Sequence, residues 1–403
     1  MKKGWVVKTL DEISEILNGG TPDTTVQKFW DGENLWITPK DMGRLKSIYV
    51  DDTLRKITDE GLKNSSAKIL PPNSIILSSR APIGHLAINT KPISTNQGCK
   101  GLVPKKGVDT LFLYYFLSKS VDLLNSLGTG ATFKELSGSK LGTVEIPLPS
   151  LPEQQRIVAI LDEAFAAIAK AKANAEQNLK NAKELFESYL QGVFENKGEG
   201  WEEKTLKEVC AKITDGTHQT PKYFDDGFIF LSSRNVTSGK INWDNIKYID
   251  EKQHIEMHKR VAPKVGDILL AKNGTTGVAA MVDRNVVFDI YVSLAHIRVL
   301  DEVTPEFMLY FINSPIAKKQ FNKRLKGSGV PNLHLEEIRE VVIPFPKSLK
   351  EQNKLVKNLD DFSTETKKLE GIYQQKLNDL EELKKSILQK AFAGELKTVR
   401  SIA

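Results

Sequence analysis

Residues 4–24 read GWVVKTLDEISEILNGGTPDT, and residues 200–221 read GWEEKTLKEVCAKITDGTHQTP. The two stretches begin about 196 positions apart, and further pairs keep nearly that spacing. FLYYFLSKS from Phe112 matches FMLYFINSP from Phe307, and IPLPSLPEQQ from Ile146 matches IPFPKSLKEQ from Ile343. Solenoid repeats have a period of roughly 20–50 residues, so this longer period indicates one duplicated unit. We therefore expect two similar bodies related by a pseudo-twofold axis.

The composition is that of an ordinary soluble chain, with 40% hydrophobic and 27% charged residues. Lys and Arg exceed Asp and Glu by only six, so the net charge permits nucleic-acid binding without arguing for it. No apolar run approaches the roughly 18–20 residues of a membrane span, and the first residues show no signal peptide. We expect a cytoplasmic protein with no membrane partner, whose two cysteines are ordinary reduced thiols.

Each copy of the repeat has a loop-rich first part and a helical second part. The first part is rich in Gly, Pro and Asn, and its short β-branched runs alternate with brief helical pieces. This pattern predicts mixed α+β bodies with many turns. We place four segments along the chain: 1–150, 151–197, 198–347 and 348–396.

The helical parts follow Ser150-Leu-Pro-Glu153 and Ser348-Leu-Lys-Glu351, which both fit the S-x-x-E capping box. No proline follows either box for more than 40 residues, so we expect helices to about Phe194 and Phe392. Helices this long, on the order of 60 Å, need a partner outside a single globular body.

Heptad spacing identifies that partner as the other helix. The first helix carries Ile157, Leu161, Ala164, Ile168, Ala171, Ala175, Ala182, Leu185 and Tyr189 at alternating spacings of four and three, with polar Asn178 filling the position after Ala175. The second carries Leu355, Leu359, Phe362, Leu369, Tyr373, Leu380, Leu383 and Ile387, with Thr366 and Lys376 as polar breaks. Sustained spacing of this kind predicts one intramolecular antiparallel coiled coil. The alternative is that each helix lies on its own domain.

The motifs of several enzyme classes are missing from the sequence. There is no Walker loop, no GxGxxG after a strand, and no Asn/Asp-Pro-Pro-aromatic tetrapeptide of an amino-methyltransferase. His254 and His258 are four residues apart but have no cysteine or third histidine nearby, so we predict no metal site. The chain therefore looks like a non-catalytic positioning protein. Two equivalent surfaces on a rigid antiparallel rod suit duplex DNA.

Several motifs in combination resemble the specificity subunit of type I restriction-modification systems. They are the Gly19-Gly-Thr-Pro22 turn after a W-x4-L start at Trp5, the duplicated plan, and PLPSLPEQQRI from Pro147 before the first helix. The second copy of that helix start, PFPKSLKEQ from Pro344, has Lys350 where the family usually has proline. The resemblance covers nearly the whole chain.

The resemblance implies two target-recognition domains (1–150 and 198–347), each reading one half of a bipartite, asymmetric site on double-stranded DNA. It implies that the central (151–197) and C-terminal (348–396) helical regions set the spacer length and dock two modification (methyltransferase) subunits. These would methylate adenine with S-adenosylmethionine and recruit restriction subunits that use ATP and Mg²⁺. This chain itself would hold no catalytic residue, metal or cofactor.

Candidate DNA-binding residues come from loops rich in paired donors and acceptors, which base edges require, and in groups that bind phosphate. In the first domain they are Gly19, Gly20, Thr21, Thr38, Lys40, Asp41, Ser79, Arg80, Asn96 and Gln97. In the second they are Thr217, His218, Ser233, Arg234, Asn235, Lys272 and Asn273. A solvated turn is the alternative for each loop. We expect Trp36 and Trp243 in the core.

Two other functions remain open at the level of sequence. One is a protein–protein adaptor in which the coiled coil joins two binding domains that do not bind nucleic acid. The other is an enzyme whose site lies in the loop-rich bodies, but no acid, His or Ser constellation recurs in both copies.

Overall fold

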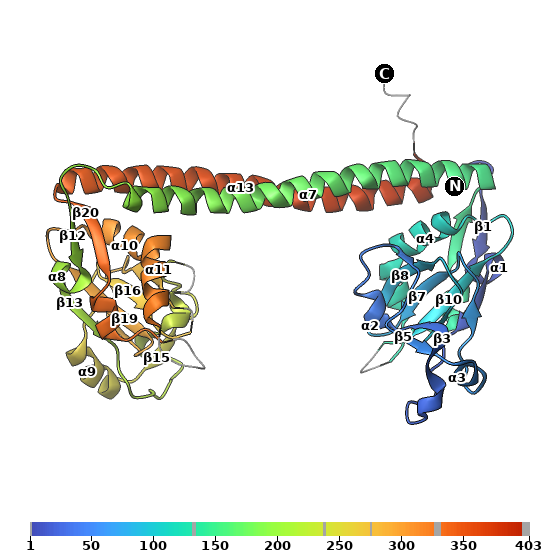
Figure 1. Cartoon of the computed structure of the whole chain (residues 1–403), viewed down its shortest axis with the longest axis horizontal. Helices are drawn as coiled ribbons and strands as arrows, with labels where there is room; N and C mark the ends of the chain where they lie inside the picture. Colours follow the sequence, from blue (N-terminus) through green and yellow to red (C-terminus); the bar gives the residue numbers. More distant parts are fainter. Residues whose placement is uncertain (1, 131–133, 237–238, 275, 326–331, 397–403) are drawn as a thin grey trace, which may run out of the picture. The chain divides into compact units, whose positions relative to one another are not determined.

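A computed structural model of the chain describes residues 2–130, 134–236, 239–274, 276–325 and 332–396. The chain forms two compact units, Met1–Ala175 with Lys376–Ala403 (unit 1) and Glu176–Gln375 (unit 2). It passes from one unit to the other within helices α7 (Leu151–Glu195) and α13 (Leu349–Ala393), which are labelled in Figure 1.

The described residues of unit 1 form three sheets. A two-stranded antiparallel ribbon joins β1 (Val6–Thr9) to β11 (Glu145–Leu148), so the start of the loop-rich part pairs with its end. The five-stranded sheet has the order β2 (Ser14–Asn18), β10 (Cys99–Pro104), β7 (Ile75–Ser79), β8 (Ile83–Asn89) and β4 (Tyr49–Val50). The four-stranded sheet has the order β5 (Arg55–Ile57), β3 (Trp30–Ile37), β9 (Ile93–Thr95) and β6 (Ile69–Leu70).

Short helices connect and cover these sheets. They are α1 (Leu10–Ile13), η1 (Gln27–Phe29), α2 (Pro39–Met42), α3 (Asp59–Lys63), α4 (Thr110–Lys119), α5 (Val121–Leu127) and α6 (Gly138–Gly142). The main core of the unit places strand residues such as Ile75 and Leu77 against Phe112 and Phe116 of α4. Asp109 caps the N-terminus of α4, and its side chain accepts a hydrogen bond from the Phe112 N–H.

Unit 2 repeats this plan. The ribbon is β12 (Trp201–Thr205) with β20 (Val342–Pro346). The four-stranded sheet has the order β13 (Cys210–Asp215), β19 (Leu294–Val299), β16 (Ile268–Ala271) and β17 (Val278–Met281). The three-stranded sheet has the order β15 (Lys247–Ile249), β14 (Phe228–Leu231) and β18 (Phe288–Ile290). Helices are α8 (Leu206–Val209), η2 (Ser233–Asn235), α9 (Glu251–Arg260), α10 (Pro305–Asn313), α11 (Pro315–Arg324) and α12 (Leu335–Arg339).

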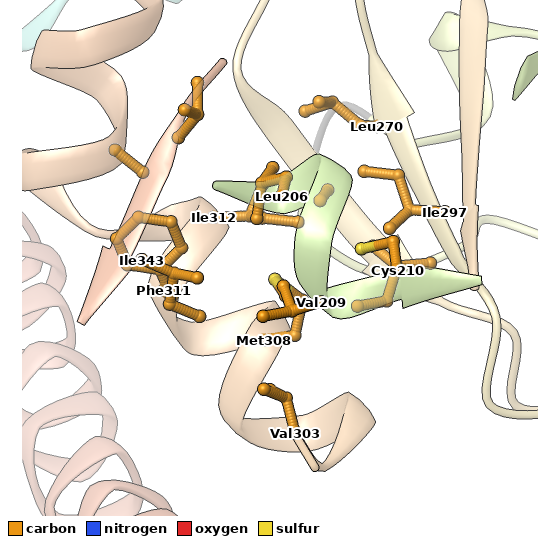
Figure 2. Packing of buried hydrophobic residues seen from close by; sticks show 14 of the residues in the cluster. Leu206, Val209, Cys210, Leu270, Ile297, Val303, Met308, Phe311, Ile312 and Ile343 are labelled. Atoms are coloured by element: carbon orange, nitrogen blue, oxygen red, sulfur yellow. The ribbon is translucent and has the colours of Figure 1, made fainter. Parts of the chain in front are cut away.

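Figure 2 shows the core of unit 2, where Leu206 and Val209 of α8 meet Met308 and Phe311 of α10. All four side chains are buried. The strand order β13-β19-β16-β17 corresponds to β2-β10-β7-β8 of unit 1, and each terminal ribbon has its counterpart. The predicted α+β class and the duplication are confirmed at the level of sheet topology. Trp36 and Trp243 are buried, as predicted.

Each unit takes an aromatic ring from the last turns of a long helix. In unit 2, Phe194 of α7 packs against Phe307 and Phe311, with ring centroids 5.2 and 5.4 Å apart. In unit 1, Phe392 of α13 packs against Phe112 and Phe116 at 5.0 and 5.5 Å. Burying such a ring stabilises by roughly 2–3 kcal/mol. The end of each helix therefore belongs to the core of the unit that it enters.

The long helices pair with each other inside each unit. In unit 1, Lys384 lies over the Phe165 ring and Lys172 binds Glu381 at 2.6 Å, so residue numbers rise on α7 as they fall on α13. In unit 2 the rings of Tyr189 and Phe362 lie 4.5 Å apart. The predicted antiparallel contact is thus found within each unit. None of the helices in the described part of the chain has the length and apolar character of a membrane span.

The predicted heptad positions, which would form the buried seam of the coiled coil, are wrong near the C-terminal end of each helix. Leu185 and Leu383 are 47% exposed, whereas the neighbouring Phe186 lies against Tyr310 of α10 and Leu388 is buried in the unit 1 core. The physical reason is that these turns face the helix and sheet core of their own unit as well as the partner helix. The buried stripe therefore leaves the heptad spacing.

A buried glutamine fastens the start of each long helix to its unit. The Gln154 Oε1 accepts a hydrogen bond from the Asp109 N–H at 2.8 Å, and its Nε2 donates to the carbonyls of Gly107 and Pro149. In unit 2, Gln352 bonds Thr304, Glu302 and Pro346 in the same way. Both side chains are fully buried. The preceding residue, Glu153, bonds the side chains of Lys2 and Arg156 instead. In the Glu-Gln pair of the helix-start motif, the glutamine is therefore the residue that joins the helix to the backbone of its unit.

We expect Gln352→Ala to destabilise unit 2 by about 2–4 kcal/mol, because it leaves one N–H and two carbonyls buried without partners. Asn353→Ala is the matched control, since Asn353 is the exposed neighbour on the same helix. Urea unfolding of the two variants provides the measurement. Equal midpoints would show that the glutamine does not fasten the helix.

Candidate nucleic-acid interface

The predicted loops of the first domain meet around Gly98. The Gly98 carbonyl accepts from the Ser79 N–H at 2.7 Å, and the Asn96 N–H donates to the Ile37 carbonyl just before the Thr38 loop. The Gly20 N–H donates to the Thr95 carbonyl at 2.8 Å, which brings in the glycine turn. We call residues 19–21, 38–41, 79–80 and 96–98 loop cluster 1.

Glycine is required where the first turn crosses the neighbouring strand end. A Cβ atom on Gly19 would lie 2.0 Å from the Asn96 carbonyl oxygen, and one on Gly20 would lie 2.3 Å from the Ala67 nitrogen. Gly216 at the corresponding place in unit 2 has the Ile290 carbonyl oxygen at 1.9 Å. Both glycine side-chain positions are closed to ligand, so Gly19 and Gly20 serve close packing.

The side chains of loop cluster 1 divide into exposed and structural groups. Lys40 and Gln97 are exposed. Thr38 and Asp41 form the capping box of α2, in which the Thr38 hydroxyl accepts from the Asp41 N–H. Thr21 bonds Gln97, and the Asn96 Oδ1 accepts from the Gly98 N–H at 2.6 Å. Arg80 is partly exposed and lies 3.6 Å from Glu135, whereas Ser79 is buried.

The loops of the second domain meet in the same backbone arrangement. The Thr217 N–H donates to the Ile290 carbonyl at 3.0 Å, and the Lys272 N–H donates to the Ser293 carbonyl at 3.0 Å. The Tyr291 N–H donates to the Leu231 carbonyl at 2.9 Å, as Asn96 does to Ile37. We call residues 217–218, 233–235, 272–273 and 291–293 loop cluster 2.

The correspondence of hydrogen bonds pairs residues across the duplication. Lys40 corresponds to Arg234, because Thr38–Asp41 and Ser232–Asn235 are equivalent capping boxes. Both basic side chains are exposed. Asn235 is buried, and its amide holds the carbonyls of Asn242 and Asn245, so it shapes the loop rather than its surface. Asn273 also has a buried Oδ1.

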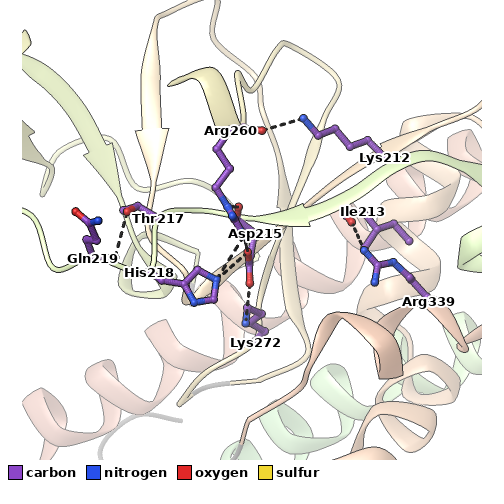
Figure 3. A network of polar contacts seen from close by, with 9 residues as sticks. All are labelled: Lys212, Ile213, Asp215, Thr217, His218, Gln219, Arg260, Lys272 and Arg339. Carbon is purple, nitrogen blue, oxygen red and sulfur yellow. Dashed lines mark hydrogen bonds and ion pairs between the residues drawn. The ribbon is translucent and has the colours of Figure 1, made fainter. Parts of the chain in front are cut away.

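A charged network joins two side chains of loop cluster 2 to Asp215 and Arg260 in an open groove (Figure 3). The Asp215 carboxylate, 3% exposed for the whole residue, binds Arg260 at 2.6 Å, Lys272 at 3.2 Å and His218 at 3.2 Å. Burial raises the pKa of Asp215, but the hydrogen bonds and charges of Arg260 and Lys272 outweigh it and hold that pKa below its ordinary value. His218 is exposed, whereas Lys272 is buried in this network.

An equivalent groove lies in unit 1, between the end of β2 and the start of α6. Its lining includes Asn18, Lys100, Lys105, Glu135 and Ser137. Lys100 is 6% exposed, and burial lowers its pKa, an effect that the charge of Glu135 partly opposes. Each groove therefore combines a buried charge with exposed polar side chains beside a loop cluster.

The sequence did not identify several of these residues. Arg260 reaches Asp215 from the end of α9, and Arg339 lines the same groove from α12. Tyr291 and Ser293 take the places of Asn96 and Gly98 in loop cluster 2. An alignment of the β9 and β18 segments would have identified Tyr291 and Ser293, but the sequence similarity between the two copies is weak there.

The clusters present what recognition of a base edge or a phosphate requires. Lys40 and Arg234 are cationic donors, Gln97 pairs a donor with an acceptor, and the loop backbones add N–H groups. The same frame carries different side chains in the two copies. The two clusters therefore offer different side chains on one backbone frame.

Comparisons with known proteins agree with this plan. The family model for the type I restriction modification DNA specificity domain matches residues 2–180 and again 198–382. The specificity subunit of type I restriction enzyme MjaIX from Methanocaldococcus jannaschii is 31% identical over 418 residues, 98% of this chain and 94% of that protein. The EcoR124I/EcoR124II specificity subunit from Escherichia coli is 36% identical over 163 residues, 39% of this chain and 40% of that protein.

Two solved structures share the fold. A chain from a structure addressing complex assembly and conformational transition of the type I R-M system has a TM-score of 0.79 at 20% identity, covering 98% of this chain and 99% of that one. The HsdS subunit from Thermoanaerobacter tengcongensis has a TM-score of 0.61 at 19% identity, with 98% of each chain covered. With the family match in both halves and a full-length relative above 30% identity, the chain belongs to the type I restriction-modification DNA specificity family.

Proposed function

We propose that this chain is the DNA recognition subunit of a type I restriction-modification complex. Residues 1–150 and 198–347 each read one half of a bipartite, asymmetric target on double-stranded DNA. The observation that carries the proposal is the pair of loop clusters with one backbone frame and different side chains. Lys40 corresponds to Arg234, Gly20 to Thr217, and Arg80 to Asn273.

The different side chains explain why the two half-sites would differ. A guanidinium such as Arg234 pairs with guanine, whereas the shorter Lys40 ammonium binds phosphate or a single acceptor. In loop cluster 1 the amide of Gln97 offers the paired donor and acceptor that adenine requires. Of the predicted residues, we propose that the exposed Lys40 and Gln97 and the partly exposed Arg80 of loop cluster 1 touch DNA. In loop cluster 2 we propose the same of the exposed His218 and Arg234. The buried Ser79, Asn235 and Lys272 support them.

The proposed partner subunits are inferred from membership of the family. We propose that α7 and α13, regions 151–197 and 348–396, set the spacer and dock two methyltransferase subunits that carry S-adenosylmethionine. Restriction subunits would bring ATP and Mg²⁺. The chain would act in the cytoplasm and perform no chemistry itself. Family membership does not favour an adaptor that never binds nucleic acid.

Methylation-aware sequencing of a host that expresses the complex would identify the target and its spacer. We then expect Arg234→Ala to relax one base position in one half-site, at a cost of about 1–3 kcal/mol for the preferred base. Competition binding of the assembled complex to single-base variants of the target measures this. Lys207→Ala is the control, because it removes an exposed positive charge of unit 2 outside loop cluster 2.

A uniform loss of affinity across all sequences would assign Arg234 to phosphate instead. Site-specific methylation that does not depend on this chain would contradict the proposed function.

A further inference from the structure

Two histidines of α9 converge on one carboxylate in unit 2. The His254 Nδ1 lies 2.7 Å from one oxygen of Asp289, and the His258 Nδ1 lies 3.1 Å from the other. The donor atoms of the three residues all lie within 4.8 Å of one another. The spacing of four on a helix puts both rings on one face, and β18 supplies the carboxylate from 31 residues further along the chain.

Asp289 places a carboxylate in the core, where the two histidines are its partners. Asp289 is 1% exposed, and a buried charge is costly without a partner. The duplicated unit shows that the fold does not need it: strand pairing puts Ser94 of β9 at the corresponding position, opposite Trp36, as Asp289 lies opposite Phe230. The Ser94 hydroxyl is satisfied by the Leu35 carbonyl at 2.8 Å. The acid is therefore a feature of unit 2 alone.

We propose that His254, His258 and Asp289 bind one divalent transition-metal ion of the zinc class. Two imidazole nitrogens and a carboxylate form a donor set that zinc accepts with a fourth position left for water, whereas Mg²⁺ and Ca²⁺ prefer oxygen donors alone. Two ligand atoms on a tetrahedral zinc ion lie about 3.3 Å apart, given bonds of ~2.0–2.1 Å. The two His–Asp separations, 2.7 and 3.1 Å, are close to that value, and the three donor atoms, which lie within 4.8 Å of one another, would have to draw together around the ion.

The residues around the three side chains fix the orientation of one imidazole and leave the site accessible to solvent. The Phe228 ring stacks on His254 at 3.8 Å with planes 7° apart, which fixes the orientation of that imidazole. The side chains of His254 and His258 are 14% and 31% exposed, so an ion and its water have access from solvent. A bound ion would tie α9 to β18, and with it Arg260 at the end of α9.

The test is a calorimetric titration of the full chain with Zn²⁺, after any affinity tag has been removed and bound metal has been taken out with a chelator. We expect one ion per chain, a higher melting temperature with Zn²⁺, and no such effect with Mg²⁺. Co²⁺ should give the visible absorption of a tetrahedral site. The binding event should disappear in His254→Ala, in His258→Ala and in Asp289→Ser.

Asp289→Ser keeps the comparison interpretable, because it installs the residue that the other copy carries at this position and should fold. His85→Ala removes a histidine of unit 1 outside the triad and should leave one ion bound. Unchanged Zn²⁺ binding in the His254→Ala, His258→Ala and Asp289→Ser variants would overturn the proposal. A wild-type chain that binds no Zn²⁺ would do so as well, and the triad would then be held by hydrogen bonds only.

Discussion

Replacing residues 1–150 by the corresponding segment of a relative with a different target is expected to change one half-site completely and to leave the other unchanged. Loop cluster 1 lies entirely within this segment, and its backbone frame is closed by bonds among residues 19–98. The junction is also suited to exchange. Gln154 stays with α7 and accepts from the backbone N–H of residue 109, so the bond does not depend on a particular side chain.

The graft must respect one contact with the rest of the chain. Phe392 of α13 packs between Phe112 and Phe116, so the donor segment should retain aromatic residues at those two positions. A graft that lacks them is the informative control, since it should lose stability before it loses specificity. Methylation-aware sequencing of cells that express each complex with its partner subunits reports both half-sites. A change in both halves at once would contradict independent recognition domains.

The sequence predicted the larger elements because the duplication and the heptad pattern are local signals. It could not predict where the seam ends. Leu185 and Leu383 satisfy the spacing but face away from the buried stripe, because Phe186 and Leu388 pack on the core of their own units. The Glu-Gln pair at the start of each long helix is visible in the sequence as a motif. The bond by which Gln154 holds the helix, however, is to the backbone of Asp109, 45 residues before it in the chain.

The structure brings the predicted loops together, but it does not leave all of their side chains exposed. Loop cluster 1 does bring together all four predicted segments around Gly98. Exposure, however, is decided by partners far apart in the sequence. The sequence suggests that Lys272 is a surface cation, but in the fold it forms a buried ion pair with Asp215. In the same way, the sequence shows His254 and His258 only as a pair four residues apart, and β18 brings Asp289 to them in the fold.

Lengthening both long helices is expected to lengthen the preferred spacer between the half-sites. The chain crosses between the units only inside α7 and α13, after Ala175 and before Lys376. Four residues inserted at each crossing add about one turn, or ~6 Å along the helix axis. At ~3.4 Å per base pair, the optimum should grow by roughly two base pairs.

The half-site sequences should persist, because neither loop cluster changes. A library with randomised spacer length is needed, since each added base pair also turns the second half-site about the DNA axis. Four residues in α7 alone should break the pairing with α13 and lower stability without giving a new optimum. Four residues inserted after Lys197, outside both helices, should leave the spacer as it was. An unchanged optimum in the folded, DNA-binding double insertion would mean that the helices dock partner subunits without measuring the DNA.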